Sequence, residues 1–167
     1  RSQFEIKNEK ARTKGEPLPY PDIDQAVKAA ADSYSLVLER GYPFGFESKL
    51  AFEEFQSKIK TAAEKFGLPE GQFAVHGSAV HKAEPNDIDV ALLVGKDEFD
   101  AFCARCLDST TKNTVKKEIE RGISNGMIRA FEFPRVNDET FGRSIYGAGG
   151  NRTIQLSVVL KGGTRDI

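Results

Sequence analysis

The sequence contains no tryptophan, a single methionine, Met127, and two cysteines in 167 residues. Two cysteines cannot build the disulfide framework of a small secreted protein. No stretch approaches the ~20 apolar residues that span a bilayer, and the chain does not open with a signal-peptide pattern. We therefore expect a protein with no membrane segment. Because the chain opens with Arg1, we also expect a piece of a longer protein or a trimmed one.

The composition is that of a folded domain. Hydrophobic residues make up 39% of the chain and charged residues 29%, which is too apolar for a disordered chain. The formal net charge of −1 argues against a general nucleic-acid coat. That sum hides an asymmetry, because residues 1–110 carry a net charge of −5 and residues 111–167 a net charge of +4. The asymmetry is either ordinary scatter or a basic surface for a phosphate-bearing partner.

Two helices are expected in the N-terminal part. Residues 1–20 are polar and read as an arm, with two prolines near its end. A first helix begins at Asp22, which has Gln25 three residues later as in a capping box, and it ends at Gly41. Helical spacing predicts one core-facing stripe in this helix and another in a second helix that ends before Gly67. The two stripes are Ile23, Val27, Ala30, Tyr34 and Val37, and Phe52, Phe55, Ile59, Ala62 and Phe66.

The pattern changes to strands after Gln72. Short apolar segments predict four strands. Two helices are expected between the second and third strands, and a glycine-rich loop before the fourth. We predict an α+β fold, in which two N-terminal helices are followed by a small mixed sheet with helices packed on it. The chain is expected to form one domain, with an arm (1–20), a helical part (21–70) and a core (71–167). The strands are Gln72–His76, Asp87–Val94, Met127–Phe133 and Arg152–Leu160; the helices are Asp97–Leu107 and Thr111–Ser124; the loop is Pro134–Gly150.

The second strand begins with two carboxylates. Alternate residues of a strand share a face, so Asp87 and Asp89 point the same way while Ile88 and Val90 point into the core. Two neighbouring carboxylates repel each other and need a cation or strong hydrogen-bond donors to stay ionised. Ligation by oxygen alone favours Mg²⁺ or Mn²⁺. The pattern therefore predicts a divalent metal site.

A possible phosphate site directly precedes this strand. Gly77 and Ser78 follow the first strand, where a glycine allows close approach of a ligand and backbone amides can hold a phosphate. Lys82 lies just beyond and is suited to a phosphate contact. A Gly-Ser pair alone is almost no evidence of function, and an Asp-x-Asp alone is usually a turn or a solvated strand edge. Together, in this order, they favour phosphoryl or nucleotidyl transfer.

These residues resemble the motif of the nucleotidyltransferase superfamily, which has the DNA polymerase β-like catalytic core. That motif begins with an apolar residue, then Gly, and then either Gly or Ser. After a gap come Asp, an apolar residue, either Asp or Glu, and a further apolar residue. The resemblance implies that the Gly-Ser pair holds a nucleoside triphosphate and that the acidic pair binds two metal ions, Mg²⁺ or Mn²⁺. The matching residues are Gly77, Ser78, Asp87, Ile88, Asp89 and Val90.

The family also uses a third carboxylate on a later strand, and by the same match this chain has Gln155 there. Glutamine carries no charge and cannot act as a base. Three interpretations remain open. Gln155 is an engineered inactivating change, or the third acid is elsewhere, with Glu132 on the preceding strand as the candidate, or the domain is catalytically inactive.

The last predicted strand resembles the small nucleotidyltransferase domains at the C-terminal ends of bacterial polymorphic toxins. The likeness rests on the strand 153–159 with its Gly162-Gly163 turn and on the acidic run Asp97–Asp100. It implies transfer of a nucleoside monophosphate from an NTP to a hydroxyl of RNA, such as tRNA, or of a protein. It also implies a neutralising immunity protein. The alternatives are a small-molecule (antibiotic) nucleotidyltransferase and an impaired module that binds nucleotide or a partner.

The two cysteines, Cys103 and Cys106, lie within a predicted helix. A zinc site would need two more ligands at a suitable spacing, and the sequence offers none. Two reduced thiols are the expected state, which indicates action in a reducing cytoplasm. A toxin module would reach that cytoplasm from a secreted or surface parent protein.

Overall fold

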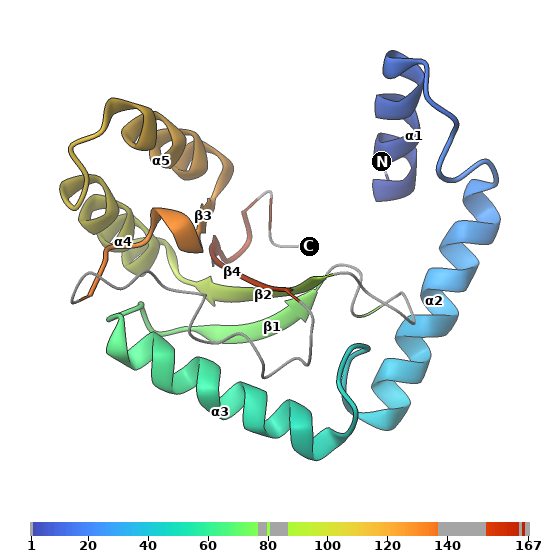
Figure 1. Ribbon diagram of the computed structural model, residues 1–167, viewed down its shortest axis with the longest axis horizontal. Helices are drawn as coiled ribbons and strands as arrows, with labels where there is room; N and C mark the ends of the chain where they lie inside the picture. The colour runs from blue at the N-terminus through green and yellow to red at the C-terminus, as the bar shows by residue number, and fades with distance from the viewer. Residues whose placement is uncertain (1, 77–79, 81–86, 137–152, 164, 166–167) are drawn as a thin grey trace.

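The structure is a computed structural model that describes residues 2–76, 80, 87–136, 153–163 and 165. Within these residues the protein has the α+β fold that the sequence predicts, with five α-helices and a four-stranded mixed sheet (Figure 1). The helices are α1 (Gln3–Lys14), α2 (Ile23–Arg40), α3 (Lys49–Lys65), α4 (Lys96–Asp108) and α5 (Asn113–Asn125). The strands are β1 (Gln72–His76), β2 (Asp87–Val94), β3 (Met127–Arg129) and β4 (Thr153–Leu160).

The sheet has the strand order β1-β2-β4-β3. Its centre is the parallel pair of β2 and β4, which runs in register from Asp87 opposite Thr153 to Val94 opposite Leu160. The edge strands β1 and β3 are antiparallel to β2 and β4, respectively. A parallel pair needs a long crossover between its strands, and α4, α5 and β3 lie in that connection.

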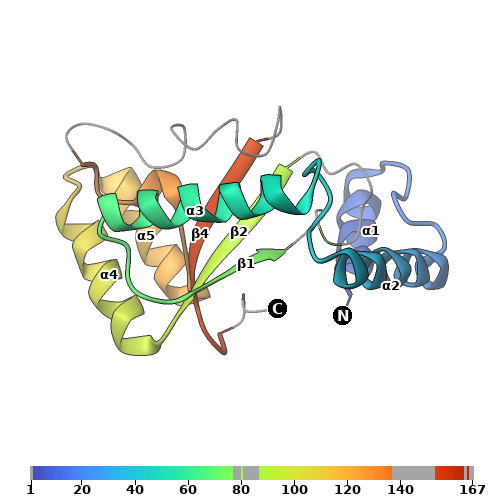
Figure 2. The ribbon, with the colours of Figure 1, turned by 90° about the horizontal axis from the view of Figure 1, so that it is seen from below.

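One face of the sheet forms the main core. Alternate residues of β2, from Ile88 to Val94, are at most 2% exposed on this face. Helices α3, α4 and α5 contribute their apolar side chains to the same cluster. In Figure 2, α3 crosses in front of the strands and α4 and α5 lie at one end of them. The predicted stripe of α3 is confirmed as core, since Phe55, Ile59 and Phe66 are buried.

Residues 3–14, within the segment predicted to be a polar arm, form helix α1, which the sequence did not predict. Ser2 and Glu5 form a reciprocal capping box at the start of α1, with the Ser2 hydroxyl accepting the Glu5 N–H at 3.2 Å. Gly15 ends the helix in the left-handed conformation, at φ +70°. The buried Asn8 side chain then ties α1 to the following segment through two hydrogen bonds to the Tyr20 backbone.

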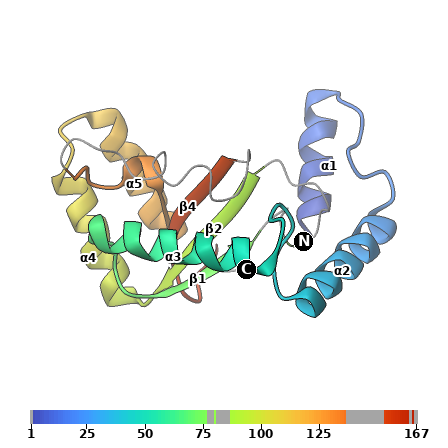
Figure 3. The same cartoon turned by 60° about the horizontal axis from the view of Figure 1, so that its bottom comes forward.

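Helix α2 begins and ends where the sequence predicts, but its apolar stripe is not core. The Asp22 carboxylate accepts the Gln25 N–H at 3.0 Å, and Gly41 follows the last turn. No residue of α2 is buried, and Val27 and Tyr34 are 45% and 50% exposed. Figures 1 and 3 show the reason, because α1 and α2 lie beyond one end of the sheet, opposite α4 and α5. None of the helices in the described ranges has the length and apolarity to cross a membrane.

The third strand is shorter than predicted. β3 stops at Arg129, and Ala130–Glu132 form a turn of 3-10 helix, η2, so Glu132 does not lie on a strand. β3 follows α5 closely, because Gly122 lets the helix approach the strand. A Cβ at this glycine would lie 2.5 Å from the Met127 carbonyl oxygen.

The core predicts a sharp contrast between two phenylalanines. Phe102 is 1% exposed and packs edge to face with Phe133 at 5.2 Å, whereas Phe131 is 62% exposed. We expect Phe102→Ala to lower the free energy of unfolding by about 3–5 kcal/mol through the cavity it leaves. The same substitution at Phe131 is expected to change it by less than about 0.5 kcal/mol. Urea unfolding monitored by circular dichroism measures both values, and equal losses would contradict this core.

Candidate active site

Three polar side chains lie in a row across the sheet, on the face opposite the main core. The register pairs His76 of β1 with Asp89 of β2, and Asp89 with Gln155 of β4. Paired residues of neighbouring strands project from the same face. Asp87 is two residues before Asp89 and therefore shares this face. We call the surface formed by His76, Asp87, Asp89 and Gln155 the carboxylate face.

The burial of β2 agrees with this assignment. Ile88 and Val90 are 0% and 2% exposed in the main core, whereas Asp87 and Asp89 on either side of Ile88 are half-buried. Both acidic side chains thus emerge from a strand whose other face is fully packed. The sequence-based prediction that the two carboxylates point away from the core, and Ile88 and Val90 into it, is confirmed.

Asp89 is the electrostatically strained group of this face. Partial burial raises the pKa of the Asp89 carboxyl, the neighbouring His76 lowers that pKa, and the negative charge of Asp87 raises it further. Removing water from a carboxylate and placing another beside it both disfavour the ionised form. A cation shared by the two aspartates would remove both penalties at once.

Gln155 occupies the position where the family resemblance implies a third carboxylate. Its side chain is exposed, and β4 holds it directly beside Asp89. The amide group can donate to a carboxylate or hydrogen-bond a substrate hydroxyl, but it cannot take up a proton. On this face the described acidic residues are therefore Asp87 and Asp89.

Glu132 lies in a different environment from the carboxylate pair. Its side chain is 5% exposed, one oxygen accepts the Arg129 backbone N–H at 3.1 Å, and the other has no partner among the described residues. Burial raises the pKa of Glu132, and the Arg129 contacts lower it in part. The carboxyl group acts electrostatically on Cys103 and Cys106, whereas the charged neighbours of Asp89 are His76 and Asp87.

The two cysteines are buried and free. Burial raises the pKa of Cys103 to about 11 and that of Cys106 to about 12. Both thiols are therefore protonated at neutral pH, and a protonated thiol is neither a good nucleophile nor a metal ligand. They pack with Phe102 and Phe133 in the main core.

The predicted nucleotide-binding residues Gly77, Ser78 and Lys82 lie outside the described residues. The same holds for the glycine-rich segment 142–150. These predictions stay untested by the geometry. The structure does describe the two strands on either side of residues 77–86, since β1 ends at His76 and β2 begins at Asp87.

Asp87 and Asp89 are the described side chains of this face that could ligate a cation. In the described part of the chain no three His, Cys, Asp or Glu side chains are grouped closely enough to hold a metal alone. Mg²⁺ does not need such a cage, because it commonly binds through one or two carboxylates, several waters and substrate phosphate oxygens. Asp87 and Asp89 supply that number of carboxylates on one face.

His76 is a residue of the carboxylate face that was not predicted from the sequence. The signal was available, because alternation along β1 puts His76 on the face opposite Phe73 and Val75. Alternation within one strand cannot tell which residue of another strand is opposite. That information comes from the antiparallel register of β1 and β2.

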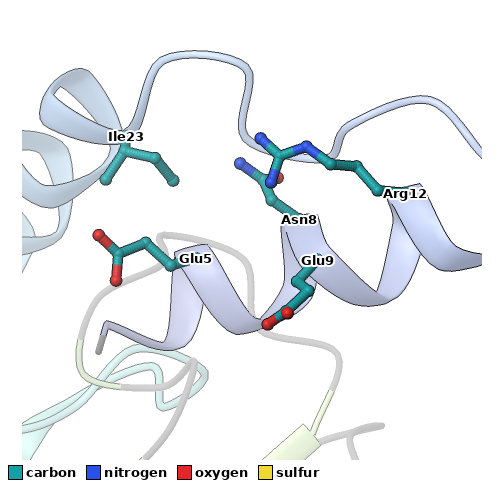
Figure 4. A pocket seen from close by; sticks show the side chains of 5 residues that line it. All are labelled: Glu5, Asn8, Glu9, Arg12 and Ile23. Atoms are coloured by element: carbon teal, nitrogen blue, oxygen red, sulfur yellow. The ribbon is translucent and has the colours of Figure 1, made fainter.

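A separate polar hollow of about 230 Å³ lies between α1 and the start of α2 (Figure 4). Its lining consists of Glu5, Asn8, Glu9, Arg12 and Ile23, and none of these residues is on the sheet. Asn8 is already committed to the Tyr20 backbone. The hollow is therefore separate from the carboxylate face.

No protein-family model, curated protein or solved structure matches this chain. The resemblance to the nucleotidyltransferase superfamily therefore rests on the short motif from Gly77 to Val90 and on the arrangement of Asp87 and Asp89.

The buried Glu132 predicts a specific pH dependence of stability. A carboxyl whose folded-state pKa is raised stabilises the fold fully below its unfolded value, about 4.3 for glutamate, and loses that contribution as the pH rises through the raised value. We therefore expect the free energy of unfolding of Glu132→Gln, relative to that of the wild type, to increase as the pH rises through this range. Urea unfolding at a series of pH values measures it, with the exposed Glu120→Gln as the control. A parallel response of the two variants would contradict the prediction.

Proposed function

We propose that this protein is a metal-dependent nucleotidyltransferase that transfers NMP from an NTP to an acceptor hydroxyl. One observation carries the proposal. Asp87 and Asp89 lie on one face of a buried strand that the Gly77-Ser78 pair precedes in the chain. Burial and the charge of Asp87 both disfavour the ionised form of Asp89. Two neighbouring carboxylates that follow a sequence suited to phosphate binding are what nucleotidyl transfer requires.

In this reaction the acceptor oxygen attacks the α-phosphorus of the NTP. A new oxygen–phosphorus bond forms, the bond from the α-phosphorus to the bridging oxygen breaks, pyrophosphate leaves, and the hydroxyl proton passes to solvent. Asp87 and Asp89 would hold Mg²⁺ or Mn²⁺, and Gly77, Ser78 and Lys82 would hold the β- and γ-phosphates. When bound, the metal would neutralise charge on the phosphates and on the leaving group.

Gln155 fits a role in orienting the acceptor. Its exposed amide is beside Asp89, within the row where the reacting hydroxyl would lie. An amide donates and accepts hydrogen bonds without changing charge, so it can position a hydroxyl without acting as its base. An enzyme of this kind relies on positioning and charge neutralisation more than on proton abstraction.

The acceptor proposed first is RNA, including tRNA, or a protein side chain, and the biological setting proposed is that of a bacterial toxin module with a cognate immunity protein. The support is the resemblance of the 153–163 segment and of the Asp97–Asp100 run. An antibiotic-like small molecule remains the alternative acceptor.

The second candidate function is nucleotide binding without transfer. It is favoured by one observation, the neutral Gln155 beside Asp89 at the position of the implied third acid. A domain with two carboxylates instead of three can retain a metal–nucleotide complex while the acceptor hydroxyl is poorly activated.

Transfer of the α-phosphate tests the proposed activity. The protein is incubated with Mg²⁺, total RNA and cell lysate, and with each NTP labelled at either the α- or the γ-phosphate. We expect label in RNA or protein from the α-labelled NTP only. Asp89→Asn should reduce transfer by about 100-fold or more, because several kcal/mol of electrostatic stabilisation are lost. The exposed Asp108→Asn is the matched control. No α-label transfer with any NTP would contradict the enzyme.

Replacing Gln155 by Asp separates the two candidate functions. In an active enzyme that uses Gln155 to orient the acceptor, we expect Gln155→Asp to leave transfer unchanged or to lower it. In an impaired module, the new carboxylate beside Asp89 would restore transfer by about tenfold or more, as expected for a positioned acid–base group. Initial rates with α-labelled NTP measure the difference, and binding of a fluorescent NTP shows whether nucleotide affinity is retained.

A further inference from the structure

His76 is the described side chain that the register sets directly against Asp89 from β1. The two residues are Cα partners in the antiparallel β1–β2 pair. Directly opposite residues of such a pair have Cβ atoms about 5 Å apart, which is within reach of an imidazole and a carboxylate. His76 is half-buried.

Asp89 is flanked on both sides by groups that can donate hydrogen bonds. The imidazole of His76 comes from β1 and the amide of Gln155 from β4. The electrostatic effect of His76 favours the ionised form of Asp89, against the effects of burial and of Asp87. A carboxylate that binds metal is commonly held by such outer partners, which fix its orientation.

We propose that His76 is a positioning residue, which orients the Asp89 carboxylate for divalent-metal binding. This inference rests on the proposed function, because it assumes that the aspartate pair binds a cation. It adds a requirement that the family motif does not contain, namely a donor on β1 immediately before Gly77. The imidazole acts through Asp89 and touches neither the nucleotide nor the metal.

Binding of Mn²⁺ alone tests the proposal without any turnover. Free Mn²⁺ is counted by electron paramagnetic resonance at about pH 8 for the wild type and for variants of His76. We expect His76→Phe, which keeps a ring but has no donor, to weaken Mn²⁺ binding by about tenfold, as is typical of lost outer partners. His76→Gln and His76→Asn each retain a donor near the position of one ring nitrogen, and at least one of them should bind close to the wild-type affinity.

Two further variants keep the outcomes distinct. Gln72 lies on the same strand and the same face as His76 but opposite Leu93, so Gln72→Ala should bind Mn²⁺ as the wild type does. Asp89→Asn reports on the metal site itself. If the wild type binds no Mn²⁺, or Asp89→Asn binds as well as the wild type, the metal site of the proposed function is wrong. If Asp89→Asn loses binding while His76→Phe does not, or if neither donor variant recovers it, only the role of His76 is overturned.

Discussion

The parallel pairing of β2 with β4 is the constraint on which the rest of the molecule depends. It brings together segments more than 60 residues apart, and each residue from Asp87 to Val94 has a partner on β4. Because side chains alternate along a strand, one register decides at the same time which residues enter the main core and which lie on the carboxylate face. A slip by one residue would bury Asp89 and expose Val90. The packing of Ile88, Val90, Leu156 and Val158 thus fixes the polar row on the other face.

The carboxylate face is costly to the fold in the absence of a cation. Asp89 is partly removed from water and lies near a second carboxylate, and among the described residues His76 is the charged neighbour that favours its ionised form. Groups held against their preferred ionisation state cluster at functional sites, since a ligand can relieve the cost when it binds. The pKa of Glu132 is raised by burial as well, but this carboxyl lies near the core thiols Cys103 and Cys106, in a different environment from Asp89.

Local sequence patterns predicted most of the sheet and the stripe of α3, because strand alternation and helical spacing are properties of single segments. The predictions that failed concern features that depend on contact between two segments of the chain. The apolar stripe of α2 is real, yet spacing cannot say whether anything covers it. Helix α1 was missed because its composition is polar, although the Ser2–Glu5 capping box and Gly15 marked its ends. In the site, alternation predicted the shared face of Asp87 and Asp89, whereas His76 required the register between two strands.

Helix α2 has a consequence for the motions of the native state. A helix of 18 residues without a single buried side chain is held chiefly by its own backbone bonds and caps. Most helical stability in proteins comes from the packing of an apolar face, and α2 has no buried side chain to supply it. Its amide protons will therefore exchange with solvent through local opening, while those of β2 and β4 exchange only when the whole domain opens. We therefore expect α2 to open more readily than the sheet, because none of its side chains is buried.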